Sequence, residues 1–165
     1  MIDTQPVVLV DDLNEDRLNH YRNSRYLAVD CETMGLQTRR DRLCVVQMCD
    51  EHGVTTLIQT RNYTAPRLKE IMERPSIEKI FHFGRFDVAA LKQWLEIDVT
   101  PVFCTKIASK IASTYTDRHG LKNLSQELLG IELNKEQQSS NWASKKLSDE
   151  QVQYASNDVI YLGEL

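Results

Sequence analysis

The chain has 165 residues, the length of one ordinary domain, and 41% of them are hydrophobic, which is enough to form a core without disulfide support. Its 20 basic and 24 acidic side chains give a net charge of −4, which excludes the broad basic surface of proteins that hold long duplexes by charge alone. The first residues carry neither a basic leader nor a long apolar run, so we expect no secretory signal and no membrane anchor.

The four cysteines form neither a closely spaced pair nor the Cys/His spacing of a zinc site. Each lies in an apolar stretch, as buried thiols usually do. We therefore expect free thiols and a cytoplasmic protein, because disulfides are rare in that compartment.

The first predicted elements are strands at residues 25–30, 43–49 and 54–59, which are rich in apolar residues. Residues 50–53 between the last two have the composition of a hairpin turn. The apolar spacing of residues 65–73 then predicts a helix, and the proline near its start suits a first helical turn.

The middle of the chain continues with a short strand at 78–83 and a helix at 86–95. Residues 101–104 favour a last short strand, followed directly by a helix over 105–114. Mixed strands and helices of this kind indicate a central sheet covered by helices, an α/β architecture.

The last third is predicted to be helical. Leucines at helical spacing indicate a helix that Gly130 ends, since glycine favours the position after a helix. Ser148 and Gln151 form a capping box that predicts a final helix through Leu165. Residues 105–146 carry 7 basic and 4 acidic side chains, so this part is either a phosphate-facing surface or a set of ordinary solvated helix faces.

Two carboxylates, Asp30 and Glu32, lie at the end of the first predicted strand. Because side chains at i and i+2 of a strand project from one face, the two acids point the same way and Cys31 points the opposite way. Neighbouring carboxylates repel each other unless a cation or a proton relieves them. The alternative is a pair of solvated acids, since one Asp-x-Glu is expected by chance among 24 acidic residues.

Three more residues are candidates for the same chemistry. Tyr154 and Asp158 are four apart on the last predicted helix and so share a face. Asp158 has apolar neighbours, where a lone charge is costly and a metal ligand is reasonable. Asp87 begins the helix after strand 78–83, a position that acids also take merely to stabilise a helix start.

The sequence resembles the DEDDy family of 3′–5′ exonucleases in three motifs and their order. These are Asp-x-Glu, then Phe-Asp at a strand-to-helix turn, then Tyr-x-x-x-Asp on a late helix. Residues 146–162, with Trp142 before them, resemble its ribonuclease D branch, although Asn141 stands where that branch more often has Asp. Three stretches resemble the small, single-domain nanoRNase C type: 35–37 with 42–47, 81–87, and 114–122.

The resemblance implies a ribonuclease H-like α/β fold, with a central mixed β-sheet flanked by α-helices, in one exonuclease domain over residues 1–165. It also implies that four carboxylates bind two divalent cations, Mg²⁺ or Mn²⁺: Asp30, Glu32, Asp87 and Asp158. Hard oxygen ligands suit these ions, which together activate water and stabilise the charge that develops at a phosphodiester. Tyr154 would orient the attacking water, because a phenol with a pKa near 10 is a weak base at neutral pH.

The resemblance also implies substrate contacts. A terminal base would meet Met34, Gly35 and Leu36, and polar parts of the substrate would meet His82, Gln138 and Ser139. Arg118, His119 and Lys122 are basic enough to contact a phosphate, although plain surface placement explains them equally well.

The implied activity is hydrolysis of single-stranded RNA from a free 3′ end, with release of nucleoside 5′-monophosphates. Short oligoribonucleotides are the expected substrates, because the acidic chain has no basic tail and no strip of stacking aromatic residues. The resemblance to the nanoRNase C type also implies that the protein is a homo-oligomer, although the last helix of that type continues beyond the position of Leu165. Two alternatives remain: a general RNA or DNA 3′–5′ exonuclease, and an inactive nucleic-acid-binding module on the same fold.

Overall fold

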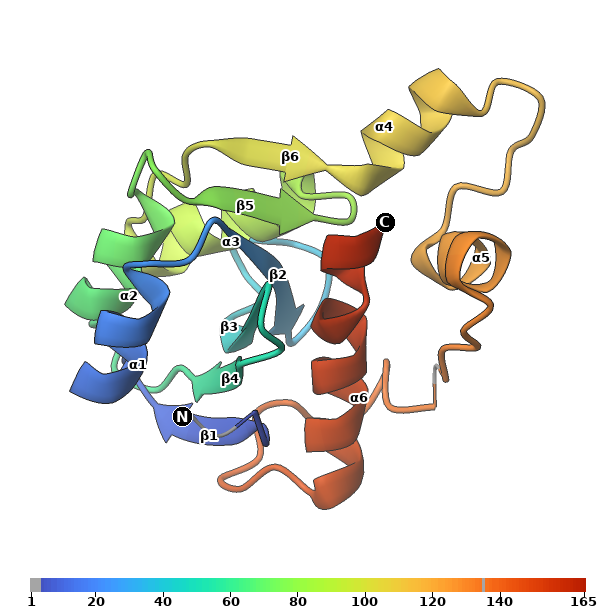
Figure 1. Ribbon diagram of the computed structural model, residues 1–165. Coiled ribbons are helices and arrows are strands. Elements are labelled where there is room, and N and C mark those ends of the chain that lie inside the picture. Colours follow the sequence, from blue (N-terminus) through green and yellow to red (C-terminus); the bar gives the residue numbers. More distant parts are fainter. Residues whose placement is uncertain (1–3, 135) are drawn as a thin grey trace.

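The computed structural model describes residues 4–134 and 136–165, which form three layers with helices on both faces of a mixed six-stranded sheet (Figure 1). The strands are β1 (Val7–Val10), β2 (Tyr26–Thr33), β3 (Leu43–Asp50), β4 (Thr55–Gln59), β5 (Glu78–Phe81) and β6 (Val102–Cys104). They lie in the order β1-β4-β3-β2-β5-β6, in which β3 is antiparallel to both neighbours and the other pairs are parallel. The predicted α/β class with a central mixed sheet is confirmed.

The helices divide between the two faces of the sheet. They are α1 (Glu15–Tyr21), α2 (Pro66–Met72), α3 (Arg85–Leu95), α4 (Thr105–Ala112), α5 (Leu121–Leu124) and α6 (Asp149–Ile160), with the π-helical turn η1 (Ser125–Leu129) and the 3₁₀ turn η2 (Leu162–Glu164). Helices α1, α2 and α3 share the larger hydrophobic core with one face, and α6 packs on the other (Figure 1). Among the described residues, no helix has the length and apolar character needed to cross a bilayer.

Strand β2 shows how the sequence assigns its side chains to the two faces. The residues that face the larger core are Leu27, Val29 and Cys31, and those that face α6 include Ala28, Asp30 and Glu32. Alternation with a period of two puts both carboxylates under α6, as their spacing predicts. The strand runs to Thr33 rather than ending at Asp30, because Glu32 still pairs with Val45 of β3.

Strand β3 lies in the middle of the sheet, and all eight of its residues are buried. Its nearly continuous apolar sequence, without alternation, is typical of a strand covered on both faces. Its cysteines follow the same rule, since Cys44 and Cys49 are buried free thiols, as predicted.

Two elements near the N-terminus lie outside the predicted set. Strand β1 is a four-residue edge strand with alternating exposure, and α1 has seven residues, so neither offers a long pattern. The Asn14 side chain caps α1 by accepting from the backbone N–H of Arg17 at 2.9 Å. In the last third, the observed helices are shorter than the predicted ones. The π-helical turn η1 replaces regular helix before Gly130, and α6 ends at Ile160 rather than at Leu165.

Candidate active site

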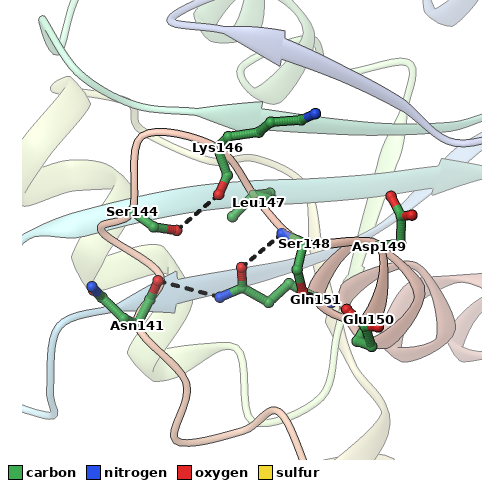
Figure 2. Close-up of a pocket in the computed structure, with 8 residues that line it drawn as sticks. All are labelled: Asn141, Ser144, Lys146, Leu147, Ser148, Asp149, Glu150 and Gln151. Atoms are coloured by element: carbon green, nitrogen blue, oxygen red, sulfur yellow. Dashed lines mark hydrogen bonds between the residues drawn. The ribbon is translucent and has the colours of Figure 1, made fainter.

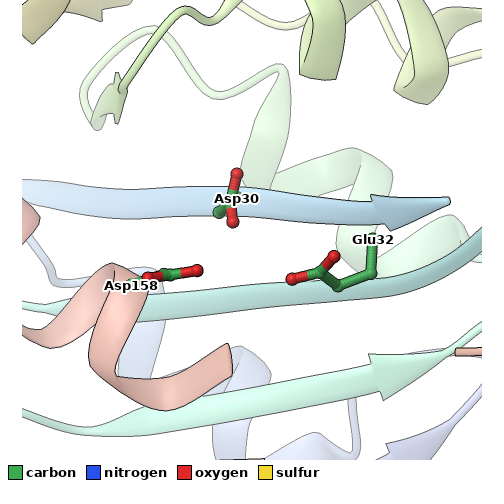
Figure 3. A group of neighbouring side chains, drawn as sticks. All are labelled: Asp30, Glu32 and Asp158. Carbon is green, nitrogen blue, oxygen red and sulfur yellow. The ribbon is translucent and has the colours of Figure 1, made fainter. Parts of the chain in front are cut away.

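Three carboxylates from two elements far apart in the sequence converge above the sheet. Asp30 and Glu32 come from β2, and Asp158 comes from α6; each offers an oxygen, and these oxygens lie within 4.8 Å of one another. Figure 3 shows the carboxylates of Glu32 and Asp158 pointing toward each other, with Asp30 beside them. The packing of α6 on β2 therefore creates a compact cluster of acidic side chains that neither element forms alone.

The carboxyl groups that β2 contributes to this cluster are buried from solvent, which raises their pKa values. Burial raises the pKa of Asp30 to about 6. Burial, followed by the charge of Asp30, raises the pKa of Glu32 to about 9. The amide nitrogen of Gln47 on β3 donates to Asp30 Oδ2 at 3.1 Å and to Glu32 Oε1 at 3.2 Å. A single donor group thus offsets part of the repulsion between two acids.

Asp87 lies next to the cluster rather than within the group of three. It is buried in the first turn of α3, where its Oδ1 accepts from the backbone N–H of Cys31 at 3.0 Å. Its side chain also lies within hydrogen-bonding reach of Asp30, and burial, followed by the Asp30 charge, raises its pKa. The strand-to-helix turn after β5 thereby brings a fourth acid against β2.

Tyr154 lies one turn before Asp158 on α6, and its ring packs on Trp142 at a centroid distance of 5.9 Å. Burial, followed by the charge of Asp158, raises the pKa of its phenol. The hydroxyl therefore keeps its proton at neutral pH. It can donate that proton in a hydrogen bond to a group in the site.

The start of α6 is fixed by the predicted capping box. Ser148 Oγ accepts from the backbone N–H of Gln151, and Gln151 Oε1 accepts from the backbone N–H of Ser148 at 3.0 Å. The amide nitrogen of Gln151 also donates to the carbonyl of Asn141 at 3.2 Å, and these contacts border a pocket of about 620 Å³ (Figure 2). This network ties the segment before α6 to the helix that carries Tyr154 and Asp158.

The carboxylates lie in a cleft of about 1070 Å³. Its lining includes every site residue predicted from the sequence: Asp30, Glu32, Met34, Gly35, Leu36, His82, Asp87, Gln138, Ser139, Tyr154 and Asp158. It also includes Phe83 and Lys106, which the sequence analysis did not single out. In the sequence, only their positions indicate a place in the site, because Phe83 precedes the Phe-Asp turn and Lys106 lies at the start of α4.

One wall of the cleft is the loop after β2. Met34 is 52% exposed and Leu36 is 85% exposed, so the loop presents apolar side chains to solvent. Asp41 holds the loop by accepting from the backbone N–H of Gln37 at 2.9 Å. A Cβ on Gly35 would lie 2.3 Å from the Asp41 carboxylate, so this close approach requires glycine.

The turn between β5 and α3 forms another wall of the cleft. Phe83 has a φ of 65°, a strained conformation for an aromatic residue, and the residue is 50% exposed. Lys106 Nζ lies 4.4 Å from the centre of that ring. His82 Nδ1 lies 3.0 Å from Thr105 Oγ1, and this hydrogen bond joins the turn to the start of α4.

The three basic residues for which the sequence allows either a phosphate contact or plain surface placement have different surroundings. Lys122 lines the cleft. Arg118 is exposed and is not part of the cleft lining. His119 is buried, with Nδ1 at 2.8 Å from Ser109 Oγ, and is not part of the cleft lining, so neither plain surface placement nor a place in the cleft describes it.

The donor set fits a hard divalent cation. The clustered ligand atoms are all carboxylate oxygens, which Mg²⁺ and Mn²⁺ prefer, and their raised pKa values show how costly their charges are without a counterion. A bound cation would relieve that repulsion. The residues placed to hold it are Asp30, Glu32 and Asp158, with Asp87 beside Asp30.

Divalent cations are therefore expected to stabilise the protein more at about pH 8 than at about pH 5. Unfolded carboxyl groups release their protons near pH 4, whereas the folded pKa values of Asp30 and Glu32 are about 6 and about 9. Without metal, the folded state therefore loses stability as the pH rises from about 4 through those two folded values. A bound cation removes this loss.

The check is the unfolding temperature with MgCl₂ and with EDTA at both pH values, followed by fluorescence. Glu32→Gln removes the group with the pKa of about 9 and should lose most of the pH-dependent part of the shift. Equal stabilisation at both pH values in the unmodified protein would contradict this electrostatic account.

A model of the 3′–5′ exonuclease family matches residues 7–165 of the chain. DNA polymerase I of Aquifex aeolicus is 33% identical over 148 residues, which cover 90% of this chain and 24% of that protein. Ribonuclease D of Sphingobium indicum is 31% identical over 141 residues, which cover 84% of this chain and 36% of that protein. The chain thus spans about a quarter to a third of these two curated relatives.

Among solved structures, the chain is similar to Brucella melitensis NrnC. The form bound to pGG has a TM-score of 0.90 at 46% identity and covers 96% of this chain and 76% of that one. The form with bound Mg²⁺ has a TM-score of 0.89 at 45% identity and covers 96% and 77%. The fold, the carboxylate cluster and these matches agree: the chain belongs to the 3′–5′ exonuclease family and is of the ribonuclease D and NrnC type.

Proposed function

We propose that this protein is a two-metal-ion 3′–5′ exonuclease that hydrolyses short single-stranded RNA and releases nucleoside 5′-monophosphates. The observation that carries the proposal is the convergence of Asp30, Glu32 and Asp158 in one cleft of about 1070 Å³. Family membership supports the reaction type, and NrnC has been solved both with Mg²⁺ and with pGG.

In this proposal, the ligands of the two cations are Asp30, Glu32, Asp87 and Asp158. When bound, the cations supply an activated water and stabilise the charge that develops on the phosphodiester. Tyr154 orients that water through its protonated hydroxyl, and Trp142 holds the Tyr154 ring in place. The buried backbone contact of Asp87 with Cys31 keeps the fourth carboxylate close to β2.

The walls of the cleft support a single-stranded substrate. The exposed ring of Phe83 offers a face on which an unpaired base can stack, which is how single strands are commonly held, and the exposed Leu36 side chain offers an apolar contact to a base. Polar parts of the terminal nucleotides would meet His82, Gln138 and Ser139, and the base would meet Met34 and Gly35.

The charge of the cleft supports a short substrate. Of the described residues that line it, the lysines are Lys106 and Lys122, so few phosphates can be neutralised there. A long strand would gain little additional affinity from such a site. Recognition of a short chain by its end is therefore favoured over binding along a polymer.

Phe83→Ala is expected to raise KM for a short RNA by about tenfold and to change kcat much less, because one stacked base is worth about 1–3 kcal/mol. The substitution removes the ring and leaves the four carboxylates unchanged. Tyr115→Ala is the matched control, since Tyr115 is another exposed aromatic residue and lies outside the cleft lining. An unchanged KM for Phe83→Ala in steady-state kinetics would show that Phe83 does not contribute to substrate binding.

The reaction is tested with one RNA labelled either at its 5′ end or at its 3′ end and incubated with Mn²⁺ or with EDTA. The proposal predicts a ladder that shortens toward the 5′ label, early release of a labelled mononucleotide from the 3′ end, and no products in EDTA. Mononucleotides with a 5′-phosphate identify the bond that is cut. Binding of RNA without any products would instead favour the inactive binding module.

A further inference from the structure

Gln47 is a polar residue in the most buried strand of the protein. It lies near the middle of β3, its side chain has no exposed surface, and Val46 and Met48 on either side belong to the hydrophobic core. A buried amide lowers stability unless its hydrogen bonds are made, and an aliphatic side chain would fill this position more cheaply. The position therefore retains a polar group at a cost to packing.

The register of the sheet directs this amide at the carboxylates. Gln47 pairs directly with Asp30 across β2 and β3, so both side chains project toward α6. Its nitrogen donates to Asp30 Oδ2 at 3.1 Å and to Glu32 Oε1 at 3.2 Å. The two hydrogens of one amide group are thus divided between two acids.

The oxygen of the same amide makes no such hydrogen bonds within the part of the chain that the structure describes. Gln47 Oε1 is buried and has no hydrogen-bond partner among the described residues. The side chain therefore satisfies the acids and leaves its own acceptor unsatisfied. An unpaired buried oxygen calls for an explanation, and the placement of the amide nitrogen against both acids supplies one.

We propose that Gln47 is a positioning residue that holds Asp30 and Glu32 side by side before any cation arrives, a role that rests on the proposed function. Cation binding needs both acids in the unprotonated form, and in that form the two carboxylates repel each other unless a shared donor lies between them. The amide keeps both oxygens directed at the place where Asp158 meets them. Ligands that are already in position bind a cation more tightly, because less ordering is left for the binding step.

The decisive variant is Gln47→Met, which keeps a similar length and removes the donor. We expect the Kd for Mn²⁺, measured by calorimetry without substrate, to rise by about 10- to 100-fold, the usual effect of removing a group that supports metal ligands. The Mn²⁺ concentration for half-maximal velocity should rise in parallel, and kcat at saturating Mn²⁺ should fall much less. Gln47→Asn keeps the amide but is too short to reach both acids, so it should weaken Mn²⁺ binding in the same direction.

The matched control is Gln59→Met. Gln59 is also a buried glutamine of this sheet, and its amide nitrogen donates to the Ser144 carbonyl at 3.1 Å, away from the carboxylates. Loss of a buried amide bond alone would change both variants equally, whereas the positioning role predicts weaker Mn²⁺ binding only at Gln47. Folding of each variant is checked by circular dichroism.

Three outcomes distinguish a failure of the positioning role of Gln47 from a failure of the proposed exonuclease function. Weaker Mn²⁺ binding in Gln47→Met and Gln47→Asn, with Gln59→Met unchanged, supports the positioning role. Equal Mn²⁺ affinity in all three variants and the unmodified protein overturns it and leaves the proposed function standing. An unmodified protein that neither binds Mn²⁺ nor degrades RNA overturns both.

Discussion

Asp30→Asn is expected to lower kcat by about 10³-fold or more at saturating RNA and Mn²⁺. Asp30 is the central member of the site: it lies in the three-carboxylate cluster, contacts Asp87 and receives a hydrogen bond from Gln47. The amide that replaces it is nearly isosteric but removes one negative charge. Stabilisation of phosphoryl charge by metal is worth several kcal/mol, and each 1.4 kcal/mol corresponds to a factor of ten in rate.

Asp16→Asn is the control for this substitution. Asp16 is an exposed acid in the first turn of α1, on the face of the sheet opposite the cluster. The same chemical change there should leave kcat within about twofold, because surface substitutions away from such features have small effects. A mild loss in Asp30→Asn, similar to that in Asp16→Asn, would rule out this carboxylate as a ligand.

Tyr154→Phe is expected to lower kcat by about 10²-fold and to leave KM for a short RNA nearly unchanged. The variant keeps the ring that packs on Trp142 and loses only the hydroxyl that faces Asp158. A group that orients or protonates the reacting atoms typically contributes about 10²–10⁴-fold to a rate. Initial rates over a range of RNA concentrations separate kcat from KM.

Direct binding completes the test of Tyr154. Affinity for RNA, measured with Ca²⁺ in place of Mn²⁺, should be the same in Tyr154→Phe and the unmodified protein. Wild-type kcat in the variant would remove the hydroxyl from the reaction. Lost RNA affinity at unchanged kcat would place the hydroxyl among the binding contacts instead.

The parts of the fold that the sequence predicts are those with a long or capped local pattern. Strand β3 and helix α6 are clear, because one is a continuous apolar run and the other opens with Ser148 and Gln151. Strand β1 and helix α1 are short and depend on tertiary contacts such as the burial of Tyr21 in the main core. The π-helical turn η1 also has no local pattern that distinguishes it from regular helix.

The site divides in the same way. The period of a strand puts Asp30 and Glu32 on one face, and the period of a helix puts Tyr154 beside Asp158. That these two pairs meet depends on α6 packing across β2, which the family resemblance supplied and local patterns do not. The contact of Gln47 with both acids depends on strand register, and the position of Phe83 depends on a strained turn.

The acidic character of the chain has a local meaning in this structure. Four of its 24 acidic residues gather in one cleft, where bound cations would neutralise them. Lys106 and Lys122 come from the basic segment 105–146 and line the same cleft, while the acidic helix α6 supplies Asp158. The net charge of −4 therefore fits a site that binds the end of a short strand with few phosphate contacts.

Preference for short RNA is measured by Mn²⁺-dependent digestion of 5′-labelled RNAs of two, five and twenty nucleotides beside DNAs of matching sequence. We expect the highest kcat/KM for the two shortest RNAs, with mononucleotides as products and no reaction in EDTA. A preference for the twenty-nucleotide RNA, or equal cleavage of the DNAs, would contradict the short-RNA assignment and favour a general exonuclease. Absence of products from every substrate would contradict the exonuclease assignment itself.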